Sequence, residues 1–146
     1  MTEKILKLND IGQTAKDIII KATKSHKDQA TVFAFYGDLG AGKTTLTKEV
    51  AKQLGVKEKV ISPTFVIMKK YKTKHDKFKN LIHIDAYRLK GSQELLRLGW
   101  NEMIKNKDNF IIVEWPERVP ECFEANCHKV NLEHKDETTR TIKFLV

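Results

Sequence analysis

The chain has 146 residues, and its 27 Lys and Arg against 19 Asp and Glu give a formal net charge of +8. With 40% hydrophobic and 32% charged residues, the composition excludes an intrinsically disordered protein and supplies enough apolar side chains for one core. The sequence shows neither an apolar run of the roughly 20 residues that span a membrane nor the apolar segment of a signal peptide. We therefore expect one cytoplasmic domain over residues 1–146 that does not bind membranes.

The first part of the chain predicts two strands and two helices. Apolar residues at helical spacing indicate the helices, and an unbroken β-branched and aromatic run, TVFAFY, is typical of a strand that is covered on both faces. In chain order, the predicted elements are a strand at 4–8, a helix at 11–22 behind the cap Asn9-Asp10, a strand at 31–36 and a helix at 44–54 that Gly55 ends.

The second part of the chain predicts further strands in alternation with helices. These elements are a strand at 66–71, a buried strand at 81–85, helices that begin at Ser92 and continue through Met103 and Ile104, a buried strand at 110–114, and a closing hairpin of 129–132 and 139–146. Apolar strands that alternate with helices favour a largely parallel sheet with helices on its faces. The predicted fold is therefore a single α/β domain.

A lysine-rich segment follows the first of these strands. Residues 69–79 hold six lysines and one acid, Asp76. Such a cluster attracts nucleic-acid phosphates through counterion release, and it also suits a solvated loop or hairpin between strands. The sequence leaves both interpretations open.

A phosphate-binding pattern lies between the predicted strand at 31–36 and the helix at 44–54. Residues 37–44, GDLGAGKT, fit G-x-x-x-x-G-K-[ST] in full. Glycines let the backbone N–H groups turn toward phosphate oxygens, Lys43 supplies a positive charge and Thr44 offers a hydroxyl to Mg²⁺. The residues predicted to bind nucleotide are Gly37, Asp38, Leu39, Gly40, Ala41, Gly42, Lys43, Thr44 and Thr45.

Two carboxylates lie at the ends of predicted buried strands. They are candidates to hold Mg²⁺, directly or through water, beside the bound phosphates. Asp85 follows the apolar residues of 81–84, and Glu114 follows those of 110–113. Ligands of open α/β sheets bind at the carboxyl ends of parallel strands, so both acids are expected beside the phosphates. The guanine-specific pattern N-K-x-D is not met at 106–109, where the acid comes one residue early, so we favour ATP with Mg²⁺ over GTP.

Three further motifs occur in order with the phosphate loop. They are residues 62–65 (SPTF), 83–89 (HIDAYRL) and 114–117 (EWPE). With these motifs the chain resembles the TsaE (YjeE) family, the small P-loop ATPases of bacterial tRNA threonylcarbamoyladenosine biosynthesis. The resemblance implies a P-loop NTPase-like domain whose ATP hydrolysis serves a complex with TsaB and TsaD, and tRNA is met indirectly or through that complex. Because no motif supplies an arginine finger, we expect slow hydrolysis by the chain alone and faster hydrolysis with partners.

The resemblance also implies roles for single residues. Thr44 and Glu114 would bind Mg²⁺, Asp85 would orient or deprotonate the attacking water, and Thr64 would lie in a switch-like loop that senses the γ-phosphate. Lys43, Thr64 and Asp85 form the expected catalytic set. For the adenine, the resemblance implies contacts from the N-terminal segment, at Asp10 and Thr14, and from the hairpin after Asp136.

Two alternative functions remain open. An acid and an arginine that follow a strand, here Asp85 and Arg88, faintly resemble elements of nucleoside kinases. A small-molecule kinase is therefore one alternative. A noncatalytic interaction module whose 62–65 loop responds to nucleotide is the other. An arginine finger has no motif of its own, although Arg88 and Arg118 are near candidates.

Overall fold

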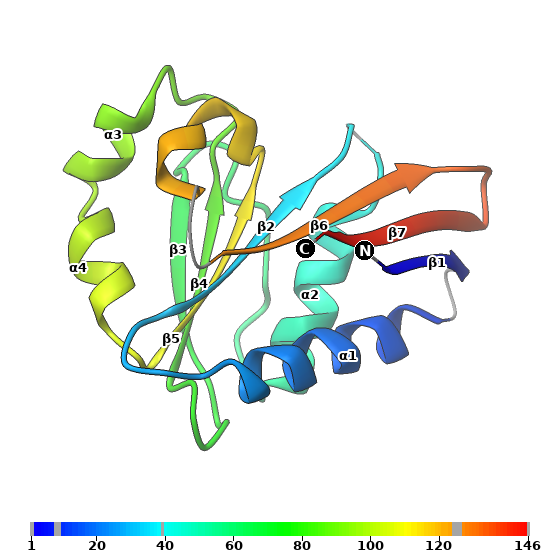
Figure 1. The fold of residues 1–146 in the computed structure, drawn as a ribbon, viewed down its shortest axis with the longest axis horizontal. Helices are drawn as coiled ribbons and strands as arrows, with labels where there is room; N and C mark the ends of the chain where they lie inside the picture. Colours follow the sequence, from blue (N-terminus) through cyan, green and yellow to red (C-terminus); the bar gives the residue numbers. More distant parts are fainter. Residues whose placement is uncertain (1, 8–9, 39, 124–126, 146) are drawn as a thin grey trace.

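The structure is a computed structural model, and it describes residues 2–7, 10–38, 40–123 and 127–145. Within these residues the strands form one seven-stranded sheet in the order β1-β7-β6-β2-β5-β4-β3 (Figure 1). The strands are β1 (Thr2–Lys7), β2 (Thr31–Tyr36), β3 (Met68–Lys72), β4 (Asn80–Asp85), β5 (Asn109–Glu114), β6 (Cys127–His134) and β7 (Thr139–Leu145). The helices are α1 (Ile11–Lys24), α2 (Lys43–Gln53), α3 (Ser92–Arg97) and α4 (Trp100–Lys105), with 3-10 turns η2 (Pro116–Arg118) and η3 (Pro120–Phe123).

The middle of the sheet is parallel and both margins are antiparallel. Strands β6, β2, β5 and β4 run in one direction. Hairpin connections add β3 to one edge and β7 to the other in antiparallel pairing, and β1, from the opposite end of the sequence, pairs antiparallel with β7. The predicted α/β fold with a parallel core is confirmed, and β3 and β7 are antiparallel because their connections are too short for a crossover helix.

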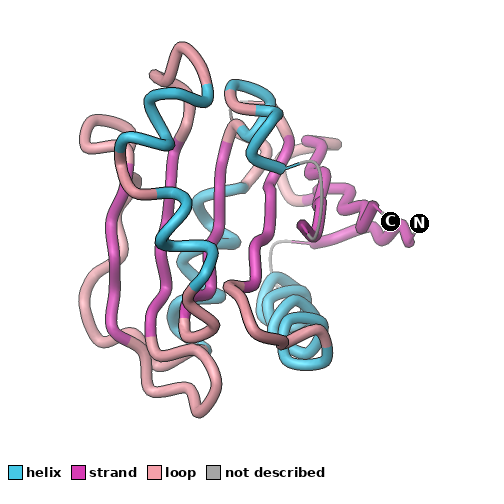
Figure 2. Tube along the Cα trace, turned by 60° about the vertical axis from the view of Figure 1, so that its left-hand side comes forward, coloured by secondary structure: helices cyan, strands magenta, loops and turns pink. Residues whose placement is uncertain are grey.

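Helices cover both faces of the sheet (Figure 2). Helices α1 and α2 pack on one face through residues such as Ile18 and Leu46, against Phe33 and Phe110 of the strands. Helices α3 and α4 with the 3-10 turns pack on the other face, where Trp100 is buried. No helix in the described part of the chain has the length and apolar character to cross a bilayer.

The strand predicted at 66–71 begins two residues later, at Met68, and ends one residue later, at Lys72. Ile67 has a left-handed backbone (φ +72°), and its N–H donates to the carbonyl of Pro63 at 2.6 Å, so the chain is still turning there. The carbonyl of Ile67 in turn accepts from the N–H of Asp85 at 2.8 Å. This backbone contact connects the 60–67 loop to the end of β4.

Candidate nucleotide-binding site

The glycine-rich segment forms a tight turn between β2 and α2. Gly37, Gly40 and Gly42 have φ of +147°, +84° and +101°, a region that side chains disfavour. A Cβ on Gly37 would lie 2.5 Å from the carbonyl oxygen of Leu132 on β6, so this position also requires glycine for close approach. Gly42 caps α2, whose first-turn N–H groups have no acceptor within the helix and are available to bind an anion.

Lys43 is a nearly buried cation with no carboxylate partner among the described residues. Its Nζ donates to the carbonyl of Gly37 and lies 3.6 Å from the ring centroid of Trp115. Burial lowers the pKa of Lys43, while Glu114 and Glu117 oppose that shift. A desolvated amine that is held only by a carbonyl and an aromatic face is well placed to gain from a phosphate.

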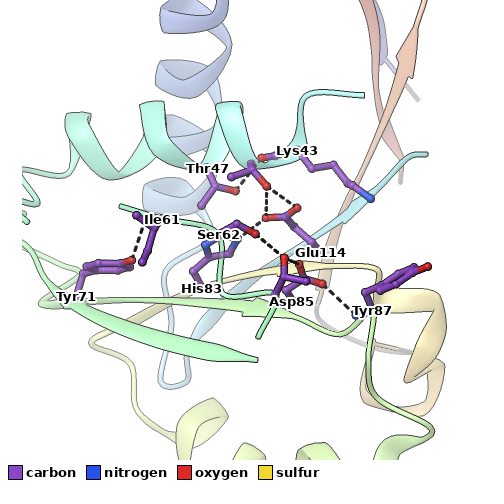
Figure 3. Close-up of polar contacts among 11 residues, drawn as sticks. Lys43, Thr47, Ile61, Ser62, Tyr71, His83, Asp85, Tyr87 and Glu114 are labelled. Atoms are coloured by element: carbon purple, nitrogen blue, oxygen red, sulfur yellow. Dashed lines mark hydrogen bonds and ion pairs between the residues drawn. The ribbon is translucent and has the colours of Figure 1, made fainter. Parts of the chain in front are cut away.

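Glu114 is the centre of a buried polar cluster (Figure 3). The hydroxyl of Thr44 donates to both carboxylate oxygens, at 2.9 and 3.1 Å, and Nε2 of the fully buried His83 pairs with Oε2. A hydroxyl beside a carboxylate is the oxygen donor set that Mg²⁺ prefers, so the residues present fit the ion. Nδ1 of His83 is buried without a hydrogen-bond partner among the described residues.

Asp85 lies beside Glu114 because β4 and β5 end in register. The two acids are partners across the parallel pair, which brings both to the same edge of the sheet. Oδ2 of Asp85 accepts from the Thr64 hydroxyl at 3.0 Å, and Oδ1 accepts from the N–H of Tyr87 at 3.0 Å. Thr64 in turn shares a 2.8 Å hydrogen bond with Ser62, so the 62–65 loop lies over Asp85 (Figure 3).

These groups surround a pocket of about 500 Å³. Of the predicted residues, the structure brings to its lining Gly40, Ala41, Gly42, Lys43, Thr44, Thr45, Thr64, Asp85 and Glu114. Gly37 and Asp38 shape the turn beneath the lining, and Leu39 lies outside the described residues. Asp10 holds the N-cap position of α1 without a side-chain cap hydrogen bond and Thr14 is buried in α1, while Ile11 between them lines the pocket, so their adenine contacts stay predictions.

The pocket also contains Arg140, a residue of the hairpin after Asp136 that no motif in the sequence marks. Arg140 lies on β7, its Nε is 4.0 Å from the Cβ position of Gly42, and this Nε is buried with no hydrogen-bond partner in the described residues. Its Nη1 donates to the carbonyl of Asp136 at 2.7 Å. The two arginines named from sequence are absent from the described lining, since Arg88 stacks on Phe65 and Arg118 on Tyr87.

Comparison with known proteins gives consistent matches. A family model described as "Threonylcarbamoyl adenosine biosynthesis protein TsaE" matches residues 8–142. A relative from Rickettsia felis, named "tRNA threonylcarbamoyladenosine biosynthesis protein TsaE", is 39% identical over 75% of this chain, which spans only 61% of that relative. A relative of the same name from Bacillus subtilis is 33% identical over 97% of this chain and 85% of its own length. The crystal structure of YdiB from B. subtilis superposes with a TM-score of 0.67 at 28% identity, over 99% of this chain and 86% of YdiB.

Proposed function

The chain belongs to the TsaE family of threonylcarbamoyl adenosine biosynthesis proteins, and on this premise we propose that it binds and hydrolyses ATP for tRNA N6-threonylcarbamoyladenosine modification. In this proposal it works in the cytoplasm with TsaB and TsaD, and it meets tRNA through that complex. The observation that carries the proposal is one pocket in which the phosphate loop, the Thr44–Glu114 pair and the Thr64–Asp85 pair converge.

Binding of the triphosphate uses groups that are already in place. The first-turn amides of α2 and the turn at 37–42 receive the phosphate oxygens. The ammonium of Lys43 leaves the Gly37 carbonyl and the Trp115 ring and binds the terminal phosphates. The phosphates stabilise its positive charge better than the carbonyl or the ring does. Arg140 approaches the same turn from β7 with a free donor.

Thr44 and Glu114 would hold the metal ion. Thr44 offers its hydroxyl oxygen and Glu114 a carboxylate oxygen, while His83 donates from Nε2 to the other carboxylate oxygen and fixes its rotation. When bound, Mg²⁺ would supply charge neutralisation across the β- and γ-phosphates.

Hydrolysis requires a group that orients water in line with the γ-phosphate. Asp85 fills this role, because Tyr87 N–H and the Thr64 hydroxyl hold its two oxygens at the pocket wall. It accepts the proton of the water as the water oxygen bonds to the γ-phosphorus and the bond to the bridging oxygen breaks. The Thr64 hydroxyl can donate to a γ-phosphate oxygen instead of to Asp85. This change of hydrogen-bond acceptor couples the 62–65 loop to the nucleotide.

The test is phosphate release by the chain alone and with TsaB, TsaD and tRNA. We expect ADP and inorganic phosphate, formed slowly by the chain alone because among the described residues only Lys43 and Arg140 bring positive charge to the pocket lining. The complex should accelerate the reaction. Transfer of the γ-phosphate to an organic acceptor would contradict the proposal and support a kinase.

A nucleotide-responsive interaction module is the second candidate. The observation that favours it is the exposure of Phe65 and Val66, at 83% and 66%, directly after Thr64. In this role ATP sets the shape of the loop and the loop docks a partner. Hydrolysis would then be dispensable, and the Asp85 variant described in the Discussion separates the two functions.

Replacing His83 by leucine should weaken the effect of Mg²⁺ on nucleotide binding. The variant removes the donor that fixes Glu114 and leaves that carboxylate with one partner fewer, so the affinity for Mg²⁺ in the ADP complex should fall about tenfold. The measurement is Mn²⁺ binding to the ADP complex by electron paramagnetic resonance.

Glutamine at position 83 is the matched variant, because its Nε2 can take the place of the imidazole Nε2. His83→Gln should recover most of the metal affinity. Leu81→Ala removes a buried side chain from the same face of β4 without touching Glu114, so it should lower the melting temperature and leave the metal affinity unchanged. Equal loss of metal affinity in all three variants would show that His83 contributes only to the packing of the core and does not position Glu114.

A further inference from the structure

The fold joins two lysine-rich segments that are separate in the sequence. The N–H of Lys74 donates to the carbonyl of Leu54 at 2.9 Å, and Gly55 lies directly against the Lys74 side chain. Residues 52–59 at the end of α2 therefore lie beside residues 69–79, which form β3 and the turn into β4. We call these two segments together the basic end of the molecule. Its lysines are Lys52, Lys57, Lys59, Lys69, Lys70, Lys72, Lys74, Lys77 and Lys79, and all nine are exposed.

Almost the whole net charge of the protein is concentrated there. The basic end has nine lysines and two acids, Glu58 and Asp76, so it carries +7 of the chain's +8. None of the nine lysines forms an ion pair with a carboxylate within the described residues. Such a surface attracts polyanions strongly and releases counterions when it binds them.

The turn between β3 and β4, which carries Lys74, Lys77 and Lys79, lies away from the nucleotide pocket along the sheet, whereas Lys69 and Lys70 pair with His83 and Ile82 nearer to the pocket. The pocket lies at the carboxyl ends of β4 and β5, where Asp85 pairs with Glu114, whereas Lys72 pairs with Asn80 at the amino end of β4. Figure 1 shows the turn between β3 and β4 at the lower end of the molecule and the start of α2 at the upper end of that helix. A ligand on this turn leaves the pocket open.

We propose that the basic end binds the phosphate backbone of RNA. Arginine and exposed aromatic residues, which anchor protein interfaces, are missing from both segments, and lysine is depleted in such interfaces. Tyr71 and Phe78 are fully buried, so they offer no platform for base stacking. The contacts are therefore made to phosphates and are independent of base sequence.

Protection of the sheet edge does not account for this surface. Lysines on an edge strand prevent pairing with another chain, and β3 is such a strand. Only three of the nine lysines lie on β3, at positions 69, 70 and 72, and the other six lie on α2 or in loops. Edge protection therefore does not explain the lysines at those six positions, which suit a ligand that extends beyond the edge strand.

The experiment uses a fluorescein-labelled unmodified tRNA transcript and a labelled single-stranded RNA of scrambled sequence. Anisotropy titrations between 50 and 200 mM salt should give binding to both RNAs with a steep salt dependence. The triple variant K74Q/K77Q/K79Q should weaken binding at 100 mM salt about tenfold and reduce the slope of log affinity against log salt by about 2. The matched control K16Q/K90Q/K135Q, with three exposed lysines outside the basic end, should change affinity less than threefold.

ADP binding by both triple variants should equal that of the parent, which separates this proposal from that of the nucleotide pocket. Equal loss of RNA affinity in the two triple variants would overturn the proposal, because net charge alone would then explain binding. Displacement of the RNA by poly-L-glutamate as efficiently as by unlabelled RNA of equal charge would also overturn it and assign the surface to acidic polypeptides. Absence of RNA binding at 50 mM salt in a chain that still binds ADP would overturn it as well.

Discussion

Replacing Lys43 by alanine is expected to abolish hydrolysis and to weaken ADP binding by about one to two orders of magnitude. The variant removes Lys43, the one nearly buried Lys or Arg among the described residues, and each charge-assisted hydrogen bond to phosphate contributes about 1.5–3 kcal/mol. The rest of the turn keeps its conformation in this variant. It is held by the hydrogen bond from the N–H of Ala41 to the carbonyl of Asp38 and by the positive φ angles of the glycines. Isothermal titration with ADP and a phosphate-release assay measure the two effects.

The control for this variant is Lys48→Ala, which removes an exposed lysine from the same helix. It should leave both measurements unchanged. Lys43→Ala should also melt at no lower temperature than the parent without nucleotide, since burying an unpaired ammonium costs stability. Near-parental affinity of Lys43→Ala for ADP would contradict the assignment of the phosphate loop.

Asp85→Asn is expected to lower the hydrolysis rate by a factor of about 10²–10⁴ while nucleotide binding is retained. Asparagine has the same shape, and its amide oxygen can still accept from the N–H of Tyr87, so the end of β4 keeps its conformation. It cannot take a proton from water at neutral pH. Single-turnover phosphate release, combined with ATP binding measured before turnover, separates the chemical step from affinity.

Thr64→Ser is the matched variant at the other end of this contact. Serine keeps the hydroxyl that donates to Asp85, so Thr64→Ser should hydrolyse ATP at close to the parental rate. If Asp85→Asn hydrolyses ATP like the parent, Asp85 only holds the loop. If it loses hydrolysis and still supports full tRNA modification with TsaB and TsaD, the chain acts as a nucleotide-responsive module.

The contiguous parts of the site could be predicted from sequence. The phosphate loop is a local pattern whose glycine positions follow from backbone geometry, and the structure gives all three of its glycines the expected positive φ. Asp85 and Glu114 could be predicted because each ends an apolar run, and parallel strands bring such ends together. These inferences need only local periodicity and one general rule of sheet topology.

The remaining parts depend on register and long-range contact. Arg140 reaches the pocket because β7 pairs with β6 and β6 lies beside β2, and this order is not encoded in any local pattern. His83 had a weak signal, since alternate residues of a strand share a face and His83 is two residues before Asp85. The contact of Lys74 with Leu54, which assembles the basic end, has no sequence signal at all.

The position of Arg140 on β7 has a consequence for synthesis on the ribosome. The glycine turn is translated early, but β7, which completes the pocket wall, is translated near the end of this sequence. At roughly 5–20 residues per second, the nascent chain spends about 5–20 s between Thr44 and Arg140 without a complete pocket. The complete wall of the pocket therefore forms only after β7 has been made. Strand β2 at the centre of the sheet likewise pairs with β5 and β6, which are both translated long after it.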